Sequence, residues 1–246
     1  MMEDNEHRHM SDVQSEFISM KKTIDDQIAS DDRNQTRSNP ITLGADGVPM
    51  FERETPSQLS LKPNAEFFNI SFEDSGEEVF ENSSGVVELV AFNRFYVRQS
   101  VVYENGAVII SQKKGDIMKV EPDFLVEKEG QNVIITISFI SLLHESEESI
   151  GGIGDESMST RLLYADKWVY TDLTDINQRV FLTINSKYAD TWDRYYTTTF
   201  ENAGLEDGID FNTTVSSETL TMNIDRVSDL TLTHAFFEAY LGRSTT

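Results

Sequence analysis

The amino-acid sequence predicts a mainly β protein of the α+β class, in which an N-terminal amphipathic helix precedes a β-sandwich-like domain with one covering helix. Three observations predict this fold. Apolar residues recur at helical spacing over the first 30 residues, alternate with polar residues in many segments after residue 41, and return to helical spacing near residues 187–203. The expected organisation is a helix over residues 1–30, a linker over 31–40 and a β-rich globular domain over 41–246.

The first expected element is a helix over about residues 6–30. Six apolar residues follow one another at spacings of three and four and therefore lie on one stripe: Met10, Val13, Phe17, Met20, Ile24 and Ile28. This length is marginal for an isolated coiled coil. The stripe either docks on the following domain or serves as an assembly stripe that packs on another subunit, and the sequence leaves both alternatives open. Residues 30–40 are polar and are expected to form an exposed linker.

Runs rich in β-branched and aromatic residues predict the strands. They cover residues 57–72, 86–90, 95–110, 133–143, 162–169, 179–184, 219–224 and 230–240. Asn105 and Gly106 separate two such runs, and this pair predicts a two-residue hairpin turn that needs positive φ at both positions. Residues 145–159 contain three glycines among acidic residues, and we expect a flexible loop there.

One helix is expected to interrupt the strands between residues 187 and 203. Trp192, Tyr195, Tyr196 and Phe200 share one face at helical spacing, and Ser186 is placed to cap the first turn. An aromatic stripe of this kind is typical of a core that covers a sheet, more than of a ligand-binding face.

Charge and composition exclude several classes of function. The 246 residues include 43 Asp and Glu against 20 Lys and Arg, which gives a net charge of -23. Such a charge repels nucleic acid and disfavours anionic membrane surfaces. The absence of cysteine excludes disulfides, thiolate nucleophiles and Cys-ligated zinc. No run reaches the length of a transmembrane helix, and no signal-peptide pattern opens the chain.

The sequence contains no motif that predicts catalysis or a cofactor site. It lacks the G-x-S-x-G and H-E-x-x-H patterns, so a hydrolase with scattered carboxylates is the least favoured hypothesis. His7 and His9 are expected at a solvated end, and His234 is expected as a satisfied residue of a strand. Among the acidic clusters, the weak candidates for calcium ligands are Glu206, Asp207 and Asp210.

Four Asn-x-Ser/Thr sequons are compatible with glycosylation of an exported protein. Their asparagines are Asn34, Asn69, Asn82 and Asn212. Asn34 lies in the polar linker and is the most favourable site. Asn69 is the least favourable, because strand alternation places it on the same face as Phe67.

Three segments resemble archaeal type IV pilin-like (pseudopilin-like) proteins of an uncharacterised haloarchaeal and methanogen family. Residues 9–17 (HMSDVQSEF) resemble the helix at which such proteins leave the membrane, residues 103–109 (YENGAVI) resemble a recurrent segment, and residues 188–195 (YADTWDRY) resemble a late helix that follows a strand. The resemblance spans most of the chain and implies no active site. It also implies an apolar anchor helix that this sequence does not contain, so we expect a soluble ectodomain of a protein anchored in the cytoplasmic membrane.

The expected function is therefore that of a non-catalytic cell-surface component that works by assembly or adhesion. Its expected partners are other pilin-like subunits or envelope proteins, reached through the N-terminal helix, with no cofactor and no nucleic acid. The alternative is a carbohydrate- or calcium-dependent binding module, which aromatic residues exposed on the sheet would favour.

Overall fold

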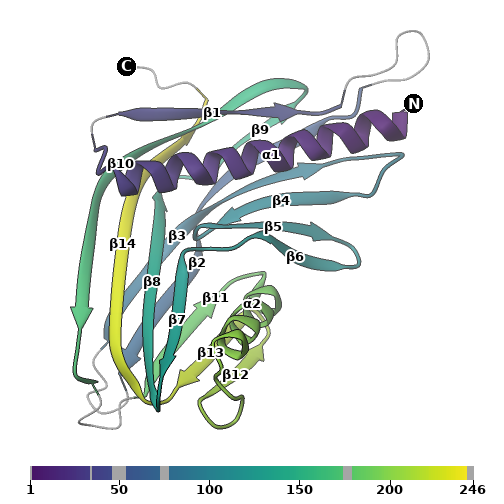
Figure 1. Ribbon diagram of the computed structural model, residues 1–246. Helices are drawn as coiled ribbons and strands as arrows, with labels where there is room; N and C mark the ends of the chain where they lie inside the picture. Colours follow the sequence, from purple (N-terminus) through teal and green to yellow (C-terminus); the bar gives the residue numbers. More distant parts are fainter. Residues whose placement is uncertain (1, 34, 46–53, 73–77, 174–178, 243–246) are drawn as a thin grey trace.

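The computed structural model describes residues 2–33, 35–45, 54–72, 78–173 and 179–242. It confirms the predicted class, because these described residues form two curled β-sheets and two helices (Figure 1). The helices are α1 (Met2–Ala29) and α2 (Ala189–Asn202).

The smaller sheet has five strands. Its order is β1 (Thr36–Leu43), β10 (Gly154–Tyr170), β14 (Val227–Leu241), β8 (Asn132–Leu143) and β7 (Phe124–Glu129). Its pairs are antiparallel except β14 with β8, which is parallel.

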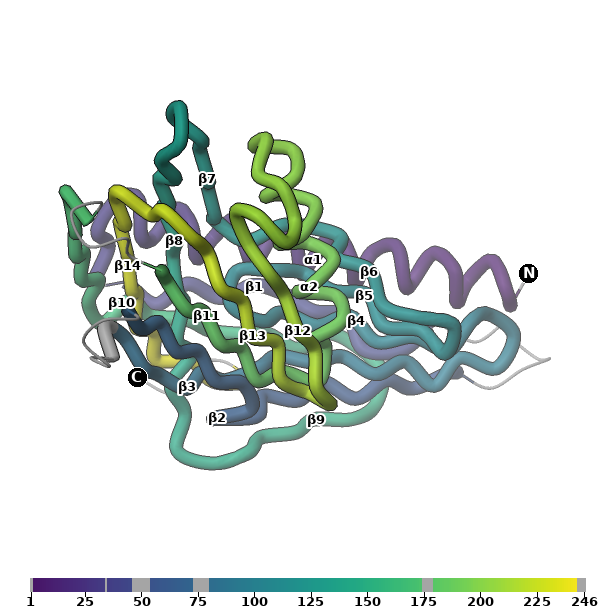
Figure 2. The backbone as a smooth tube through the Cα atoms, turned by 90° about the horizontal axis from the view of Figure 1, so that it is seen from below, coloured from purple at the N-terminus to yellow at the C-terminus, as the bar shows by residue number. Residues whose placement is uncertain are grey.

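The larger sheet has nine strands and is antiparallel in all its pairs. Its order is β12 (Phe211–Ser216), β13 (Thr219–Ile224), β11 (Val180–Asn185), β2 (Ser57–Phe72), β3 (Glu78–Ala91), β4 (Gln99–Glu104), β5 (Ala107–Gln112) and β6 (Gly115–Val120). A ninth strand, β9 (Glu148–Gly152), pairs with the first part of β2, and Figure 2 shows it along that edge.

Each helix covers its own hydrophobic core, and the long strands contribute to both cores. β14 places Leu232 in the core beneath α2 and Phe237 in the core beneath α1. These positions are an odd number apart, so they point from opposite faces of the strand. The β4–β5 hairpin also contributes to both cores. Val102 faces the core beneath α2, and Val101 faces the core beneath α1. Figure 1 shows α1 above this hairpin and α2 below it.

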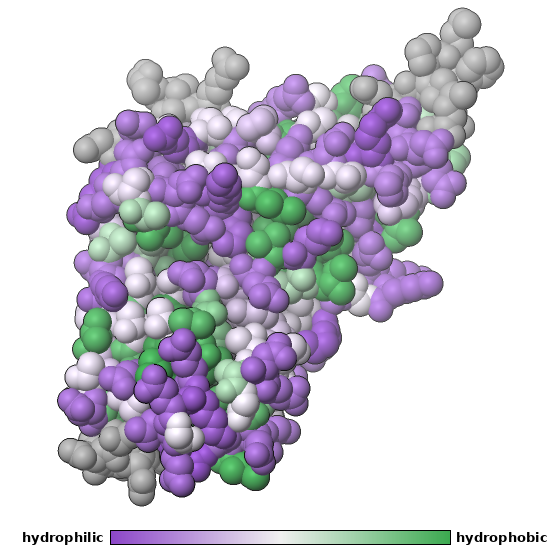
Figure 3. Space-filling model, in the orientation of Figure 1, coloured by the Kyte–Doolittle hydropathy of each residue, from purple (hydrophilic) through white to green (hydrophobic). Residues whose placement is uncertain are grey.

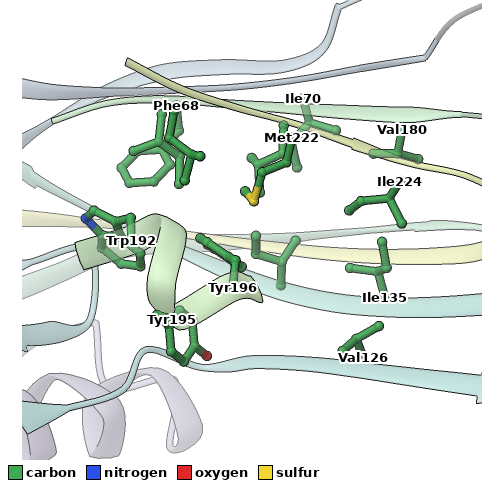
Figure 4. Close-up of a cluster of buried hydrophobic side chains, with 14 of the residues drawn as sticks. Phe68, Ile70, Val126, Ile135, Val180, Trp192, Tyr195, Tyr196, Met222 and Ile224 are labelled. Atoms are coloured by element: carbon green, nitrogen blue, oxygen red, sulfur yellow. The ribbon is translucent and has the colours of Figure 1, made fainter. Parts of the chain in front are cut away.

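The aromatic face of α2 is buried, as its spacing predicts. Trp192, Tyr196 and Phe200 are fully enclosed between the two sheets. Figure 4 shows Trp192 and Tyr196 between the strands that carry Phe68 and Met222 and those that carry Val126 and Ile135.

The apolar stripe of α1 lies in the core of the same chain. Five of its six residues have no more than 1% of their surface exposed, and Ile28 packs beside them. The five are Met10, Val13, Phe17, Met20 and Ile24. Of the two alternatives that the sequence left open, the structure thus shows docking on the following domain, and the stripe does not form an exposed assembly surface.

Two loops expected from the sequence are strands, and these expectations were wrong. The linker over residues 31–40 already contains the start of β1, where Asn39 is buried and pairs with Met158 of β10. The expected loop over residues 145–159 forms β9 and the start of β10. The polar composition of these two segments gave no sign of strands, because each strand is stabilised by pairing with a strand that is remote in sequence.

The hairpin turn at Asn105 and Gly106 is confirmed. Both residues have positive φ, 43° and 77°, and Glu104 pairs with Ala107 across the turn. A side chain at position 106 would meet the Cδ1 atom of Ile140 at 3.3 Å. Glycine is therefore required here both by the backbone conformation and by the space available.

Candidate functional site

The main candidate site is a cleft of about 600 Å³ where the bend of β2 approaches the ends of β8 and β14 and the bulge in the middle of β10. We call it the β8–β9 cleft. Its residues come from five segments: Pro63 and Asn64 of β2; Leu142 and Leu143 of β8; His144, Glu145 and Ser146 of the turn into β9, with Glu148 as the first residue of β9; Leu163 of β10; and Glu238, Ala239 and Tyr240 of β14. The lining combines apolar side chains with hydrogen-bonding groups, which is the usual composition of a small-ligand site.

The charged groups that line the cleft are mainly carboxylates. Glu148 accepts a hydrogen bond from the backbone N–H of Leu241 at 2.8 Å and lies 3.2 Å from Nε2 of His144. Glu238 forms a 2.7 Å ion pair with Arg161 at the rim. Among the described residues Glu145 has no hydrogen bond or ion pair, and no lysine or arginine lines the cleft. The cleft therefore favours hydroxyl groups or cations and repels anions.

A row of aromatic residues leads along the sheet towards the cleft. Tyr164 stacks on Phe236 with 4.3 Å between ring centroids, and Tyr164 and Trp168 are 40% and 37% exposed. Phe236, Glu238 and Tyr240 are two residues apart along β14, so all three lie on the same face of that strand. Exposed aromatic surface and the polar cleft thus occupy one continuous face.

A buried polar cluster of Asn82, Ser141 and His234 connects β3, β8 and β14. The Nε2 atom of His234 lies 2.7 Å from the Ser141 hydroxyl and 2.9 Å from the Asn82 amide nitrogen. Ser141 and His234 have no more than 2% of their surface exposed, and burial lowers the pKa of His234 to about 4. A hydroxyl enclosed in this way is not accessible to a substrate, so the cluster serves to satisfy buried polar groups.

A second buried polar group lies where β11 turns into α2. The Glu104 carboxylate accepts hydrogen bonds from the Ser186 hydroxyl and, at 2.6 Å, from the Trp192 indole nitrogen. Ser186 also accepts a hydrogen bond from the backbone N–H of Tyr188 at 2.9 Å. Neither carboxyl oxygen of the neighbouring Glu66 has an ordinary hydrogen bond among the described residues. This group orients the start of α2.

The predicted calcium candidates do not form a cation site. Asp210 is buried and its carboxylate lies between two cationic side chains, with Lys128 at 2.7 Å and Arg226 in direct contact. Glu206 and Asp207 are exposed. Within the described ranges no group of three or more Asp, Glu, His or Cys residues could hold a metal ion. Asp210 is therefore neutralised by protein cations, which does not favour calcium binding at this residue.

The predicted glycosylation sites differ in their surroundings. Asn212 is exposed on β12, whereas Asn69 is half-buried on a central strand. Asn82 donates to Ser141 and His234, so its amide is already engaged. Asn34 lies outside the described residues.

The histidines near the N-terminus are not both solvated, contrary to expectation. His9 is buried and its Nε2 atom lies 2.9 Å from the carbonyl oxygen of Thr42, while His7 is exposed and packs edge-on against Tyr96. His234 is buried and hydrogen-bonded, as expected.

Comparison with protein-family models, with curated proteins and with solved structures finds no match to this chain. Among the described helices, none is long and apolar enough to cross a membrane.

Proposed function

We propose that this protein is a non-catalytic adhesion component of a cell envelope and that the β8–β9 cleft binds a neutral or amine-bearing carbohydrate. The observation that carries the proposal is the continuity of exposed aromatic side chains with a carboxylate-lined cleft on one face of β14. Sugar rings present apolar faces and hydroxyl edges, and the two parts of this surface complement these features. Acidic sugars would be repelled by Glu145, Glu148 and Glu238.

The structure bears on how such a protein could assemble. Because the stripe of α1 is buried in its own domain, pilin-like assembly through that stripe is not part of this proposal. Adhesion through the exposed cleft is favoured instead, and calcium dependence is not included, because no metal-binding group occurs among the described residues.

Titration calorimetry against neutral, amine-bearing and acidic oligosaccharides tests the proposal. Glu145→Gln should weaken binding about tenfold or more, because a hydrogen bond to a charged group contributes about 1.5–3 kcal/mol. Tyr240→Ala should also weaken binding, because it removes an aromatic ring that lines the cleft. Glu206→Gln removes an exposed carboxylate outside the cleft and serves as the matched control. Failure of every oligosaccharide to bind, or an equal loss in the control variant, would contradict the proposal.

The proposed location is tested separately. Mass spectrometry of the native protein from envelope fractions should find any glycan at Asn212 rather than at Asn82, because only the former side chain is exposed. Recovery of the unmodified protein from the cytosol alone would remove the support for a surface location.

A further inference from the structure

The turn between β3 and β4, residues 92–98, exposes an unusual group of apolar side chains. Phe92, Phe95 and Val97 are 43%, 50% and 48% exposed, and the exposed Arg94 and Arg98 lie in the same turn. We call these five residues the β3–β4 tip. Single exposed apolar residues need no explanation, but a contiguous group indicates an interaction surface. Figure 1 shows this turn at the end of the molecule where the chain begins, and Figure 3 shows apolar surface among the polar surface at that end.

The tip is held rigidly by a buried carboxylate of α1. Glu6 is fully buried and accepts hydrogen bonds from the backbone N–H groups of Arg94, Phe95 and Tyr96 at 3.0, 2.8 and 2.7 Å, and from the Thr55 hydroxyl at 2.8 Å. Burial opposes ionisation of Glu6, but these donors outweigh it and lower the pKa of the carboxyl. The exposed side chains are therefore displayed by a fixed backbone.

The turn is also braced from within. The Asn93 side chain donates a hydrogen bond to the carbonyl oxygen of Val97 at 2.9 Å, and Nε of Arg98 donates to the carbonyl oxygen of Asn93 at 3.3 Å. A fixed turn loses little conformational entropy when it binds, which favours its use as a contact surface.

The hollow beside the tip carries a charge opposite to that of the whole chain. Phe92, Arg98 and Lys113 line a hollow of about 380 Å³ between the β3–β4 and β5–β6 turns. The other described lining residues are apolar or uncharged, and none is acidic. In a protein of net charge -23, two cations without a carboxylate in one hollow provide local complementarity to an anion.

We propose that the β3–β4 tip binds the surface of an anionic lipid bilayer, with Phe95 and Val97 entering the headgroup region and Arg98 and Lys113 holding a lipid phosphate. Aromatic and apolar side chains beside basic ones are typical of contacts with the membrane interface. The negative charge of the remaining surface repels the same bilayer, so the contact is confined to this end of the molecule. The inference is independent of the function proposed for the β8–β9 cleft.

Co-sedimentation of the full chain with phosphatidylcholine vesicles, with and without phosphatidylglycerol, tests the proposal. The wild type should bind the phosphatidylglycerol vesicles. Arg98→Gln and Lys113→Gln should each weaken that binding about fivefold at low salt, as expected for a basic residue near an anionic surface. The double variant Phe95→Ser/Val97→Ser should lose binding. The control Ile117→Ser/Leu125→Ser removes two apolar residues elsewhere that are at least as exposed, and this variant should bind as the wild type does.

Thermal unfolding of each variant shows whether it is folded before its binding is interpreted. The proposal is overturned if the wild type fails to bind anionic vesicles or if the control variant loses binding equally. It is also overturned if inorganic phosphate alone displaces the vesicles while Phe95→Ser/Val97→Ser still binds, because this shows a site for a free anion. Self-association that disappears in Phe95→Ser/Val97→Ser, with no vesicle binding, would assign the tip to a contact between copies of this chain.

Discussion

Replacing Glu66 with glutamine should make the stability of the protein less dependent on pH above about pH 5. Glu66 and Glu104 are both 2% exposed. Burial is the largest cause that raises the pKa of Glu66 well above its usual range, and the negative charge of Glu104 is the next. Burial also raises the pKa of Glu104. Because Glu104 accepts hydrogen bonds from Ser186 and Trp192, the proton that the folded pair retains resides mainly on Glu66.

The sign and size of the effect follow from proton linkage. The unfolded chain releases this proton near the ordinary glutamate pKa of 4.5, whereas the folded chain keeps it to higher pH. The stability that protonated Glu66 contributes is therefore fully present below the pKa of Glu66 in the unfolded chain. It is lost as the pH rises towards the pKa of Glu66 in the folded chain. While the folded chain holds one proton that the unfolded chain has released, the free energy of unfolding falls by about 1.4 kcal/mol per pH unit. Glutamine stays neutral over this pH range, so Glu66→Gln removes this loss.

Urea unfolding at pH 5, 6 and 7 measures the effect as a difference between variants, which cancels the contribution of the other carboxylates. The free energy of unfolding of Glu66→Gln, relative to wild type, should rise steadily over this range. Glu121→Gln, at an exposed position, is the matched control and should follow the wild type. Parallel pH profiles for wild type and Glu66→Gln would show that Glu66 is ionised in the folded state and would refute the reasoning.

Three further predictions concern stability. Phe17→Asp should lower the free energy of unfolding by more than the roughly 3–5 kcal/mol typical of Phe→Ala in a core, because it also buries a charge; an unchanged melting temperature would contradict the docking of α1. Gly106→Val should cost on the order of 1 kcal/mol or more through backbone strain and contact with Ile140, measured by chemical denaturation, and equal stability would refute the turn geometry. Millimolar calcium should raise the melting temperature no more than magnesium at equal ionic strength, because Asp210 already pairs with Lys128 and Arg226; a calcium-specific rise that Glu206→Gln abolishes would contradict this.

Local features of the chain could be read from the sequence because their causes are local. The turn at Asn105 and Gly106 depends on positive φ at two adjacent residues, and few residue types other than these tolerate it. The strand over residues 57–72 follows from the alternation of apolar residues, and the helix that carries Trp192 follows from the helical spacing of its aromatic residues. The acidic residues from position 145 onwards also stood out in the sequence, but as an expected loop rather than as part of a cleft.

The candidate site could not be read in this way, because it is assembled from distant segments. Asn64, Glu145 and Tyr240 meet only when the bend of β2 is brought against the ends of β8 and β14. No local pattern distinguishes these polar residues from the many others on the surface. The β3–β4 tip is similar, because its rigidity comes from Glu6, which is nearly 90 residues earlier in the chain.

The tertiary structure likewise decided which charged residues are buried and which surface the apolar stripe of α1 packs against. An amphipathic pattern specifies that one face of a helix must be covered, but the covering surface here is built from strands that extend as far as Ala239. Glu6, Glu66 and Glu104 look like surface residues in the sequence, and their burial depends on which strands and turns enclose them. The sequence by itself thus determined where apolar faces occur, whereas only the pairing of remote strands determined what covers them and which polar groups are enclosed, because burial is a property of surfaces brought together by folding.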